Sequence, residues 1–395
     1  MVLKERVAIV NKIFWPDGTL IGEALLEISK QLSSDYEVIV VAQSKNNLRQ
    51  LQLAECNRKI FKAVTCQPIS DRSSVLVLRI LDAIYYMCFA LAALIINRPT
   101  YVYVSTNPPI FVPYVVSIYC RIVGAKYLYH IQDIHPEAAD IVVPMSRIVF
   151  NCLRYIDTIV LRHATSIVTL TPRMQNSLIR RGGIVAPISI EDNPANSVVL
   201  PCGDALSRNE LIYCGSLGRF QNIPLLVDAI EGYIRDGGKL SFLFCGDGVF
   251  ASRVEALAKK FEGVKYLGPV TPREAAKLVA EHKWAILPTD DRVTEYAFPS
   301  KSSTYLVAGC NIFAISGKGG AISEWVARNQ VGFVVEPTFS EIVSGLFKIE
   351  SIYSESNKLE TGKFKLIYSM RRFGESIANR IRDMHRQNLY DGKDV

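Results

Sequence analysis

Residues 210–245 decide the fold, and they read ELIYCGSLGRFQNIPLLVDAIEGYIRDGGKLSFLFC. The apolar run 210–214 predicts a buried strand, which ends at a turn that contains glycine. Apolar residues at helical spacing then predict a helix over 223–235, and the run 240–245 predicts a second strand. Strands that alternate with helices in this way indicate a parallel sheet with helices on both of its faces.

The same alternation runs through both halves of the chain. In the first half we expect strands at 6–11, 36–42, 101–105, 126–131 and 166–170, with helices at 22–32 and 110–123. In the second half we expect further strands at 264–267, 284–287 and 311–315, with helices at 250–261, 302–307, 321–328 and 341–349. The segment 186–208 is rich in Pro, Asn, Asp and Ser, and it is predicted to be a linker.

Two α/β domains follow from this pattern. We expect Rossmann-like domains with doubly wound parallel sheets over 1–190 and 209–365, facing each other across a cleft. Ligands of such sheets bind beyond the carboxyl ends of the strands, where the loops converge. A basic helix over about 366–388 is predicted to end the chain.

The composition fits a folded protein of this size. The chain has 395 residues, of which 49% are hydrophobic and 21% charged, and this excludes a disordered chain. Its longest apolar run, 83–96, has fourteen residues, whereas a helical membrane span needs about 20. Asp82 and Arg79 precede the run and Asn-Arg-Pro follows it, so we expect a buried helix there.

The start of the chain and its cysteines favour a cytoplasmic protein. The first ten residues, MVLKERVAIV, lead directly into a strand pattern and lack the core of a signal peptide. Nine cysteines lie scattered without a CxxC motif or a Cys/His cluster. This distribution indicates reduced thiols and gives no support for a zinc site.

The formal net charge of +7 comes from two short segments. Residues 141–185 and 358–386 each carry an excess of five positive charges, whereas 201–357 has 16 basic and 18 acidic residues. The first segment contains a predicted helix, 145–163, with Arg147, Asn151, Arg154, Thr158 and Arg162 on one face. Such a helix fits an anionic membrane surface, and it equally fits a domain helix with a solvated basic face. No nucleic-acid-binding motif accompanies it.

Several loops after predicted strands have residues suited to an anion. They are 16–19 (PDGT), 214–219 (CGSLGR), 246–248 (GDG), 299–303 (PSKSS) and 317–320 (GKGG). Four of them contain glycine, and 299–303 has serines and a lysine at a helix start. The loops 16–19 and 214–219 also fit ordinary tight turns. None forms the GxxxxGKS/T motif and no GxGxxG follows the first strand, so a P-loop nucleotidase and a dinucleotide-binding enzyme are not indicated.

Residues 129–137, YHIQDIHPE, form the densest cluster of ionisable groups. They follow a predicted strand of the first domain, so we expect them to face the cleft. His130 and Asp133 suit general acid–base chemistry or the binding of sugar hydroxyls. The alternative is structural, with His130 hydrogen-bonded at the strand end and Asp133 capping a helix.

Nine motifs are spread over almost the whole chain: NKIFWPDGTLIGEALLEISKQL (11–32), STNPPIFVP (105–113), YHIQDIHPEAA (129–139), IEDNPAN (190–196), FLFCGDGVF (242–250), VKYLGPVTPREAAKLVAEHKWAILPT (264–289), FPSK (298–301), YLVAG (305–309) and GKGGAISEWV (317–326). In their order and spacing they resemble glycosyltransferase family 4, whose fold is GT-B. Those in the first half resemble bacterial members that build surface polysaccharides, such as lipopolysaccharide O-antigen, capsule and exopolysaccharide.

The resemblance implies a retaining transfer of a sugar from a nucleotide sugar to a hydroxyl, here of a lipid-linked oligosaccharide acceptor. The domain 209–365 would hold the donor without a metal or other cofactor. The domain 1–190, with the terminal helix 366–390 packed back on it, would bind the acceptor. We expect a cytoplasmic protein, peripheral on the inner face of the cytoplasmic membrane, attached through 145–163 and the terminal basic helix. A degenerate homologue that acts as a binding partner and a sugar-nucleotide epimerase stay open as alternatives.

The resemblance also assigns site residues. The usual Arg and Lys of the first loop in the donor domain fall on Ser216 and Gln221, and the usual Glu-x7-Glu pair falls on Tyr296 and Thr304. Arg219 and Lys301 are therefore expected to balance the diphosphate charge. The predicted donor-binding residues are Gly18, Thr19, Gly215, Ser216, Arg219, Gln221, Val270, Ser300, Lys301 and Thr304, and the predicted catalytic residues are Asp133, His130 and Glu295. The family's catalytic-region His falls on Gln132, two residues after His130.

Overall fold

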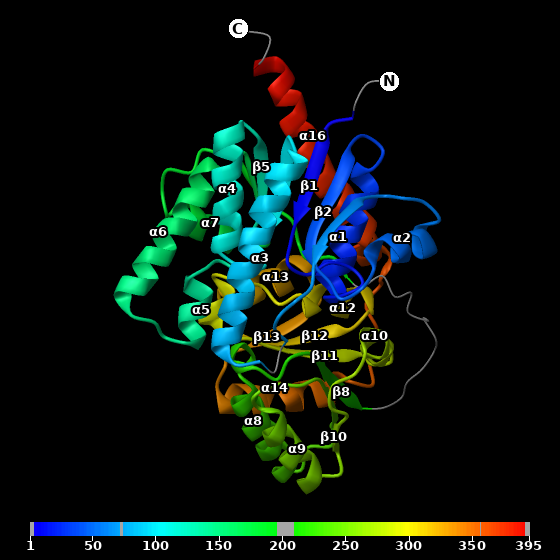
Figure 1. Cartoon of the computed structure of the whole chain (residues 1–395). Helices are drawn as coiled ribbons and strands as arrows, with labels where there is room; N and C mark the ends of the chain where they lie inside the picture. Colours follow the sequence, from blue (N-terminus) through cyan, green and yellow to red (C-terminus); the bar gives the residue numbers. More distant parts are fainter. Residues whose placement is uncertain (1–3, 72–73, 196–208, 356, 392–395) are drawn as a thin grey trace. The chain divides into compact units, whose positions relative to one another are not determined.

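The chain forms two compact units, each built on one parallel sheet (Figure 1). The computed structural model describes residues 4–71, 74–195, 209–355 and 357–391. Unit 1 comprises Met1–Asp192 together with Met370–Val395, and unit 2 comprises Asn193–Ser369. The chain therefore returns to the first unit after it has completed the second.

Unit 1 contains a sheet of seven parallel strands in the order β3-β2-β1-β4-β5-β6-β7. The strands are β1 Arg6–Val10, β2 Glu37–Gln43, β3 Lys62–Cys66, β4 Tyr101–Ser105, β5 Lys126–His130, β6 Ser166–Thr169 and β7 Ile188–Ile190. All five residues of β4 are buried because helices cover both faces of the sheet. The direction of strand order reverses between β1 and β4, which places a topological switch point at the loops after these strands.

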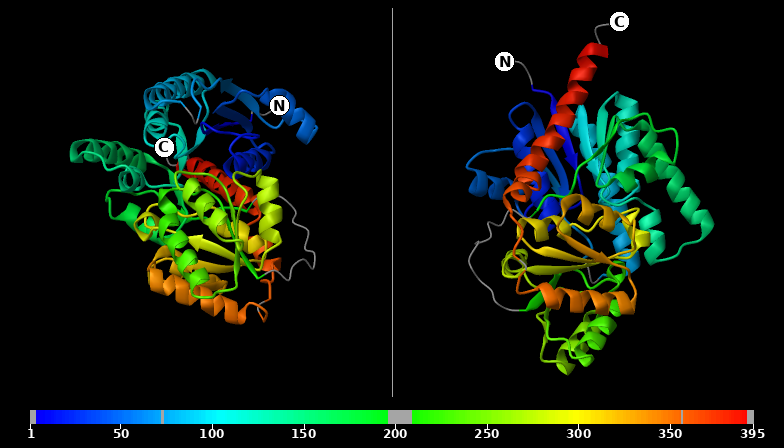
Figure 2. Two further views of the ribbon diagram at one scale, coloured as in Figure 1. Left: turned by 90° about the horizontal axis from the view of Figure 1, so that it is seen from below. Right: turned by 180° about the vertical axis from the view of Figure 1, so that it is seen from behind.

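Helices cover the two faces of the unit 1 sheet in two separate groups. Their bounds are α1 Thr19–Leu32, α2 Leu48–Cys56, α3 Leu76–Asn97, α4 Phe111–Val123, α5 Glu137–Val142, α6 Arg147–His163, α7 Pro172–Ile179 and α16 Met370–Asp391. The helices α3, α4 and α6 pack side by side on the face seen in Figure 1. On the opposite face α16 packs along α1, as Figure 2 shows from behind, and buries Phe373, Ile377 and Ile381 in the same core as α1.

Unit 2 repeats the architecture with six parallel strands in the order β10-β9-β8-β11-β12-β13. The strands are β8 Glu210–Cys214, β9 Ser241–Cys245, β10 Val264–Tyr266, β11 Trp284–Pro288, β12 Asn311–Ile315 and β13 Gly332–Val335. The helices are the short 3-10 helix η1 Arg219–Gln221, α8 Ile223–Arg235, α9 Ala251–Lys260, α10 Pro272–Ala280, α11 Asp291–Thr294, α12 Lys301–Val307, α13 Ala321–Asn329, α14 Phe339–Ile352 and α15 Gly362–Ile367. Its core lies between the sheet and helices α8, α9 and α14.

Parallel α/β sheets in both halves were predicted, and the structure confirms them. The predicted strands 101–105, 210–214 and 311–315 and the helix 223–235 have the same bounds in the structure. Two local predictions were wrong. The expected linker 186–208 contains β7, because residues 188–190 pair with β6, and its part 196–208 lies outside the described residues. The expected terminal helix is interrupted between Ile367 and Met370.

The prediction of a buried helix over 83–96 was also wrong. The helix α3 extends over 22 residues, and only 33% of its most apolar window is buried. Among the described residues, α3 is the one helix whose length and composition would allow it to cross a membrane. The sequence pattern missed this exposure because apolar residues lie on both faces of the helix, so its periodicity does not distinguish the inner face.

Candidate functional site

The loops after β8 and β9 meet at one edge of the unit 2 sheet. Gly215 follows β8 with φ 151°, and Gly246 follows β9 with φ 132°. A Cβ atom at Gly246 would lie 1.9 Å from the carbonyl oxygen of Gly215, so only glycine permits this approach. The amide of Leu217 also donates to the carbonyl of Asp247 at 2.9 Å. The two turns thus support each other beyond the carboxyl ends of their strands, where parallel sheets bind ligands.

Lys301 brings a cation into this pair of turns from the first position of α12. Its Nζ donates to the hydroxyl of Tyr213 at 2.8 Å and lies 4.1 Å from the centre of the same ring. A Cβ atom at Gly215 would lie 2.9 Å from this Nζ, so the glycine leaves the room that the ammonium occupies. The sequence predicted Gly215 and Lys301 as donor-binding residues, and the structure brings the two together.

The environment of Lys301 is short of negative charge. Among the described residues, no carboxylate lies within ion-pair distance of its Nζ, and the partners are a phenol and a ring face. Desolvation lowers the pKa of Lys301 to about 7, against a smaller opposing effect of the neighbouring Cys214 thiol. A bound anion would supply the missing counter-charge and restore the charged form of the ammonium.

Two tyrosines that the sequence analysis did not single out hold this turn. The hydroxyl of Tyr213 donates to the carbonyl of Ser216, and the hydroxyl of Tyr305 donates to the carbonyl of Cys214 at 3.1 Å. The amide of Cys214 in turn donates to Tyr305 Oη at 3.0 Å. Both rings are fully buried, which leaves the loop few alternative positions. For Tyr213 the signal in the sequence was an aromatic residue with a polar end inside an otherwise aliphatic strand.

Ser216, Arg219 and Gln221 lie on the loop between β8 and α8. The missing side chain of Gly218 leaves room for Ser216 Oγ and Gln221 Oε1, each 3.0 Å from where a Cβ would be. The Oε1 atom of Gln221 is buried and has no hydrogen-bond partner among the described residues. Ser216 and Arg219 are exposed. Four predicted donor-binding residues, Gly215, Ser216, Gln221 and Lys301, are therefore neighbours here, and Arg219 begins η1 on the same loop.

The remaining predicted residues of unit 2 lie at α11, at α12 and between β10 and α10. Ser300 is exposed, and its side chain makes no capping hydrogen bond at the start of α12. Thr304 is half-buried one turn into α12, and Val270 is half-buried between β10 and α10. Glu295 is half-buried at the end of α11. Their assignments stay predictions.

The Gly-rich turn 317–320 already holds carboxylates of the protein. The amide of Gly317 and the hydroxyl of Ser316 each donate to Asp291 at 2.5 Å. The amide of Lys318 donates to Glu336 at 2.8 Å. These donors are therefore committed to internal acceptors, which distinguishes this turn from the loop after β8.

In unit 1 the loop after β1 leads into α1 through Gly18. Gly18 has φ 74°, and a Cβ there would lie 2.1 Å from Cγ2 of Ile13, so glycine is required by both conformation and space. Thr19 is the first residue of α1. The backbone at Gly18 is thus fixed close to a helix start, as the sequence suggested, and its role toward a donor stays a prediction.

His130 lies in the interior of unit 1 at the end of β5. It is 0% exposed, and its Nδ1 lies 2.6 Å from the hydroxyl of Tyr103. Burial, with a smaller effect of Arg380, lowers the pKa of His130 to about 4, so the ring is neutral at physiological pH. Of the two interpretations of His130, the hydrogen-bonded residue at a strand end fits this environment. The catalytic assignment of His130 stays a prediction, and the complete burial of the ring argues against it.

Asp133 is exposed on the loop after β5. The helix α5 begins at Glu137 and its N-cap is Pro136, so the expected helix-capping role of Asp133 was wrong. An exposed carboxylate beyond the carboxyl end of a strand remains available to a ligand of unit 1.

A buried ion cluster fixes the loop that carries Asp133. Arg181, whose side chain is 2% exposed, contacts the carboxylates of Glu137 and Asp157, and its Nη2 donates to the carbonyl of His135 at 2.8 Å. The hydroxyl of Tyr129 donates to Asp157 at 2.9 Å. The sequence analysis missed this cluster because its members lie far apart in the chain and follow no common motif.

Other features of the described residues bear on cofactors. They contain no group of three or more His, Cys, Asp or Glu residues that could hold a metal ion. The eight cysteines among them are free thiols. The predicted absence of a metal cofactor stays a prediction.

The fold and one domain match known proteins. Residues 208–348 match the family model described as Glycosyl transferases group 1. The structure is similar to that of Anabaena Alr3699/HepE in complex with UDP, with 14% sequence identity and a TM-score of 0.63 over 96% of this chain and 100% of that one. It is similar to sucrose-phosphate synthase from Thermosynechococcus elongatus, with 11% identity and a TM-score of 0.69 over 98% of this chain and 100% of that one. It is also similar to the apo form of the lipopolysaccharide outer core galactosyltransferase WaaB, with 14% identity and a TM-score of 0.59 over 95% of this chain and 99% of that one. No curated protein sequence matches significantly.

These similarities define the class of the protein. At such identities the solved structures show the fold, which is GT-B with its two parallel-sheet α/β domains. The matched family model covers most of unit 2, including the loop after β8 and the start of α12. Unit 2 thus contains a group 1 glycosyl transferase domain, and the protein is a glycosyltransferase.

Proposed function

We propose that the protein transfers a sugar from a nucleotide sugar to a hydroxyl of a lipid-linked acceptor, with retention of the anomeric configuration, in the biosynthesis of a surface polysaccharide. The group 1 match over 208–348 supports sugar transfer by unit 2. The resemblance of the motifs in 11–32, 105–113 and 129–139 to bacterial polysaccharide enzymes supports the acceptor class.

The observation that carries the donor part of the proposal is the uncompensated ammonium of Lys301. It lies desolvated beside Gly215, where a side chain would collide with it. The same loop carries the exposed Arg219. The Oε1 atom of Gln221, which has no hydrogen-bond partner among the described residues, can accept a hydrogen bond from a ligand. A diphosphate is the part of a nucleotide sugar that needs such cations, since charge-assisted hydrogen bonds to phosphate are the strongest available.

In the proposed reaction Lys301 and Arg219 stabilise the negative charge that develops on the departing diphosphate. The acceptor hydroxyl attacks from the face of the sugar that the leaving group vacates. These two cations take the place of a metal ion, so the proposal requires no cofactor. Asp133 is the candidate in unit 1 to orient a hydroxyl, because its carboxylate is exposed on an anchored loop.

The proposal places the enzyme on the inner face of the cytoplasmic membrane, attached through α6. Arg147 and Arg162 are exposed on this helix, Arg154 is exposed and pairs with Glu137 at 3.3 Å, and Ile148 beside them is 83% exposed. Attachment through the terminal helix α16 stays a prediction, but several of its arginines are engaged within unit 1. Its basic residues Arg372 and Arg380 pair with Glu191, and Arg382 pairs with Asp35, so little free charge remains.

Product analysis tests the proposal. Incubation with UDP-, GDP- and CMP-sugars, with and without membranes that carry lipid-linked acceptors, should give sugar transfer that depends on one donor and on the acceptor. Conversion of the nucleotide sugar without an acceptor would instead establish the epimerase. A donor that stabilises the protein but is never consumed would establish the degenerate homologue.

A further inference from the structure

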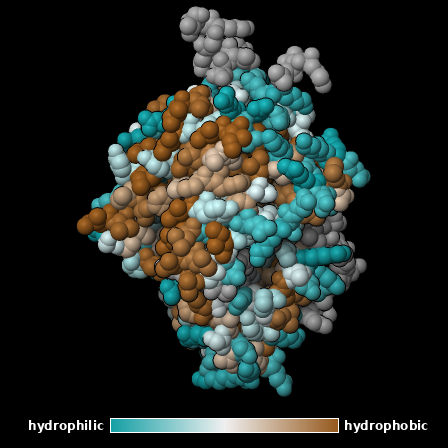
Figure 3. Space-filling view, viewed as in Figure 1, coloured by the Kyte–Doolittle hydropathy of each residue, from teal (hydrophilic) through white to brown (hydrophobic). Residues whose placement is uncertain are grey.

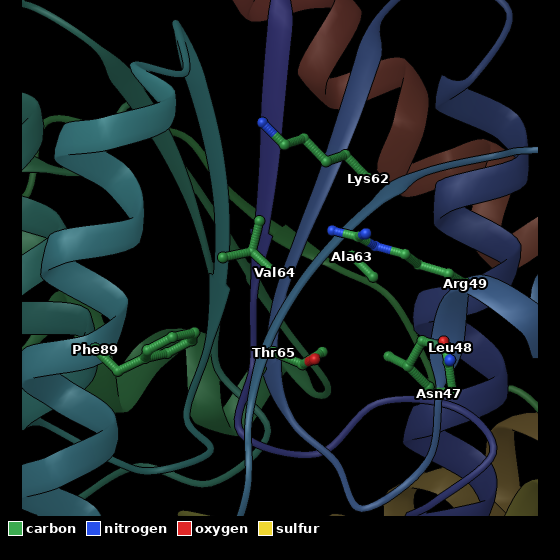
Figure 4. A pocket seen from close by; sticks show the side chains of 8 residues that line it. All are labelled: Asn47, Leu48, Arg49, Lys62, Ala63, Val64, Thr65 and Phe89. Carbon is green, nitrogen blue, oxygen red and sulfur yellow. The ribbon is translucent and has the colours of Figure 1, made fainter.

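A pocket opens at the free edge of the unit 1 sheet, away from the residues discussed so far. It has a volume of about 490 Å³ and lies between α2, the edge strand β3 and α3 (Figure 4). Its lining residues are Asn47, Leu48, Arg49, Lys62, Ala63, Val64, Thr65 and Phe89. The strand β3 is paired on one side only, so part of its backbone N–H and C=O groups face this opening.

The pocket is basic and holds no acid. Arg49 from α2 and Lys62 from β3 are exposed, and neither makes an ion pair within the described part of the chain. Lys62 Nζ donates to the neutral side chain of Asn97 at 2.8 Å, which positions the ammonium without neutralising it. A second pocket of about 400 Å³ shares both residues and adds Lys59, again without an acidic residue. Three cations therefore gather at this edge.

The helix beside the pocket exposes an apolar face. On α3 the exposed large side chains are Val77, Ile80, Leu81, Ile84, Tyr85, Ile95 and Ile96, of which Ile96 is 76% exposed. The neighbouring helices α4 and α6 add Phe111, Ile122, Val123, Ile148, Val149 and Tyr155. Figure 3 shows hydrophobic side chains gathered over these helices. Exposed apolar surface on this scale marks a site of interaction.

The inner face of α3 is held to unit 1 by buried hydrogen bonds. The outer face is therefore exposed in the folded unit. Asp82 is 0% exposed and accepts hydrogen bonds from Lys12, Gln43, Ser70 and the amide of Ile69. Burial alone would raise the pKa of Asp82, but these hydrogen bonds lower that pKa to about 2. A helix tied to the sheet by a buried carboxylate does not leave it to span a bilayer, because the charge would be transferred to hydrocarbon.

We infer that the Arg49–Lys62 pocket binds the phosphate of an anionic membrane lipid, while the outer face of α3 lies among the lipid acyl chains. Charge complementarity selects this occupant over a second copy of the chain, because the pocket is basic and the adjoining face is apolar, as in a phospholipid surface. Phe89, which points from α3 into the pocket in Figure 4, joins the two parts. The inference rests on the proposed membrane attachment, and it is independent of sugar transfer.

Vesicle binding of the full chain tests the inference. Phosphatidylcholine vesicles with and without phosphatidylglycerol are compared for the wild type, for Arg49→Gln/Lys62→Gln and for the control Arg235→Gln/Lys259→Gln on unit 2. Each basic residue near an anionic surface contributes about a fivefold factor, so the pocket variant should lose about 20-fold in partition to the anionic vesicles. The control, which removes the same charge elsewhere, should stay within about twofold.

The outcomes separate the lipid from other sources of phosphate. Ile84→Ser/Ile96→Ser should weaken binding to both kinds of vesicle, since it removes apolar contact alone. Equal binding of the pocket variant and the wild type would overturn the inference, as would protection by inorganic phosphate without any vesicle binding. Donor protection is measured in parallel. The pocket variant should keep it, so a failure of this inference is distinguishable from a failure of the proposed function.

Discussion

At the loop after β5 in unit 1, the buried guanidinium of Arg181 contacts two carboxylates. At the loop after β8 in unit 2, by contrast, the ammonium of Lys301 has a phenol and a ring face as its partners and no carboxylate among the described residues. The first charge is compensated inside the protein, so it serves to fix a loop. The second is left without a counter-ion, at a position where glycines keep the backbone close. A desolvated cation without an internal carboxylate points to a ligand, and an ion-paired cation points to a structural role.

The largest expected effect concerns the compensated charge. Arg181→Met leaves the buried Asp157 without a cation and Glu137 with Arg154 alone, and it should lower the free energy of unfolding by about 3–5 kcal/mol in urea titrations. The exposed Arg121→Met serves as the control and should change little. Nucleotide affinity of the folded Arg181 variant should be unchanged. If Arg181→Met kept its stability and lost donor binding, Arg181 would belong to the donor site and the contrast between the two loops would be wrong.

The second effect is the pH dependence of donor binding. The charged form of Lys301 is needed for the diphosphate, and desolvation lowers its pKa to about 7, so the free protein loses this proton as the pH rises through about 7. Affinity for a UDP-sugar, followed by calorimetry, should therefore fall above that pH by up to about tenfold per unit. In Lys301→Arg the charge is permanent and the slope should disappear. A flat profile in the wild type would contradict the desolvated ammonium.

A smaller effect is expected for the residue that positions this ammonium. Tyr213→Phe removes the hydroxyl that accepts from Lys301 and donates to the Ser216 carbonyl, while the ring contact remains. One hydrogen bond to a charged group corresponds to about a tenfold loss of donor affinity. A merely structural role would lower the thermal midpoint alone, whereas a positioning role also shifts the pH profile. Unchanged affinity and profile would remove Tyr213 from the site.

The smallest effect contrasts two helix starts in unit 2. Thr271 forms a capping box with Glu274 at the start of α10, so Thr271→Ala should cost about 1 kcal/mol of unfolding free energy. Ser300 makes no such bond at the start of α12, so Ser300→Ala should stay within about 0.5 kcal/mol. Chemical denaturation of the two variants measures both. A loss for Ser300→Ala equal to that for Thr271→Ala would show that Ser300 does cap α12.

The sequence predicted what depends on local pattern. Buried aliphatic strands followed by glycine, such as 210–214, were placed with their bounds, and the resemblance assigned Gly215 and Lys301 to the donor site. Contacts between distant residues were out of reach, because nothing in the local sequence connects Arg181 with Glu137 or Tyr213 with Lys301. The helix α3 was misjudged for another reason. Apolar residues fill both of its faces, and only Asp82 marks the inner one.

The central claim is that Lys301 provides the charge that binds the donor diphosphate. Its most direct test is the affinity of UDP for the wild type, for Lys301→Met and for Lys277→Met, an exposed lysine on α10 of the same unit. Loss of a charged hydrogen bond to phosphate predicts about 10- to 100-fold weaker binding for Lys301→Met and no change for Lys277→Met. Equal UDP affinity of Lys301→Met and the wild type would contradict the account.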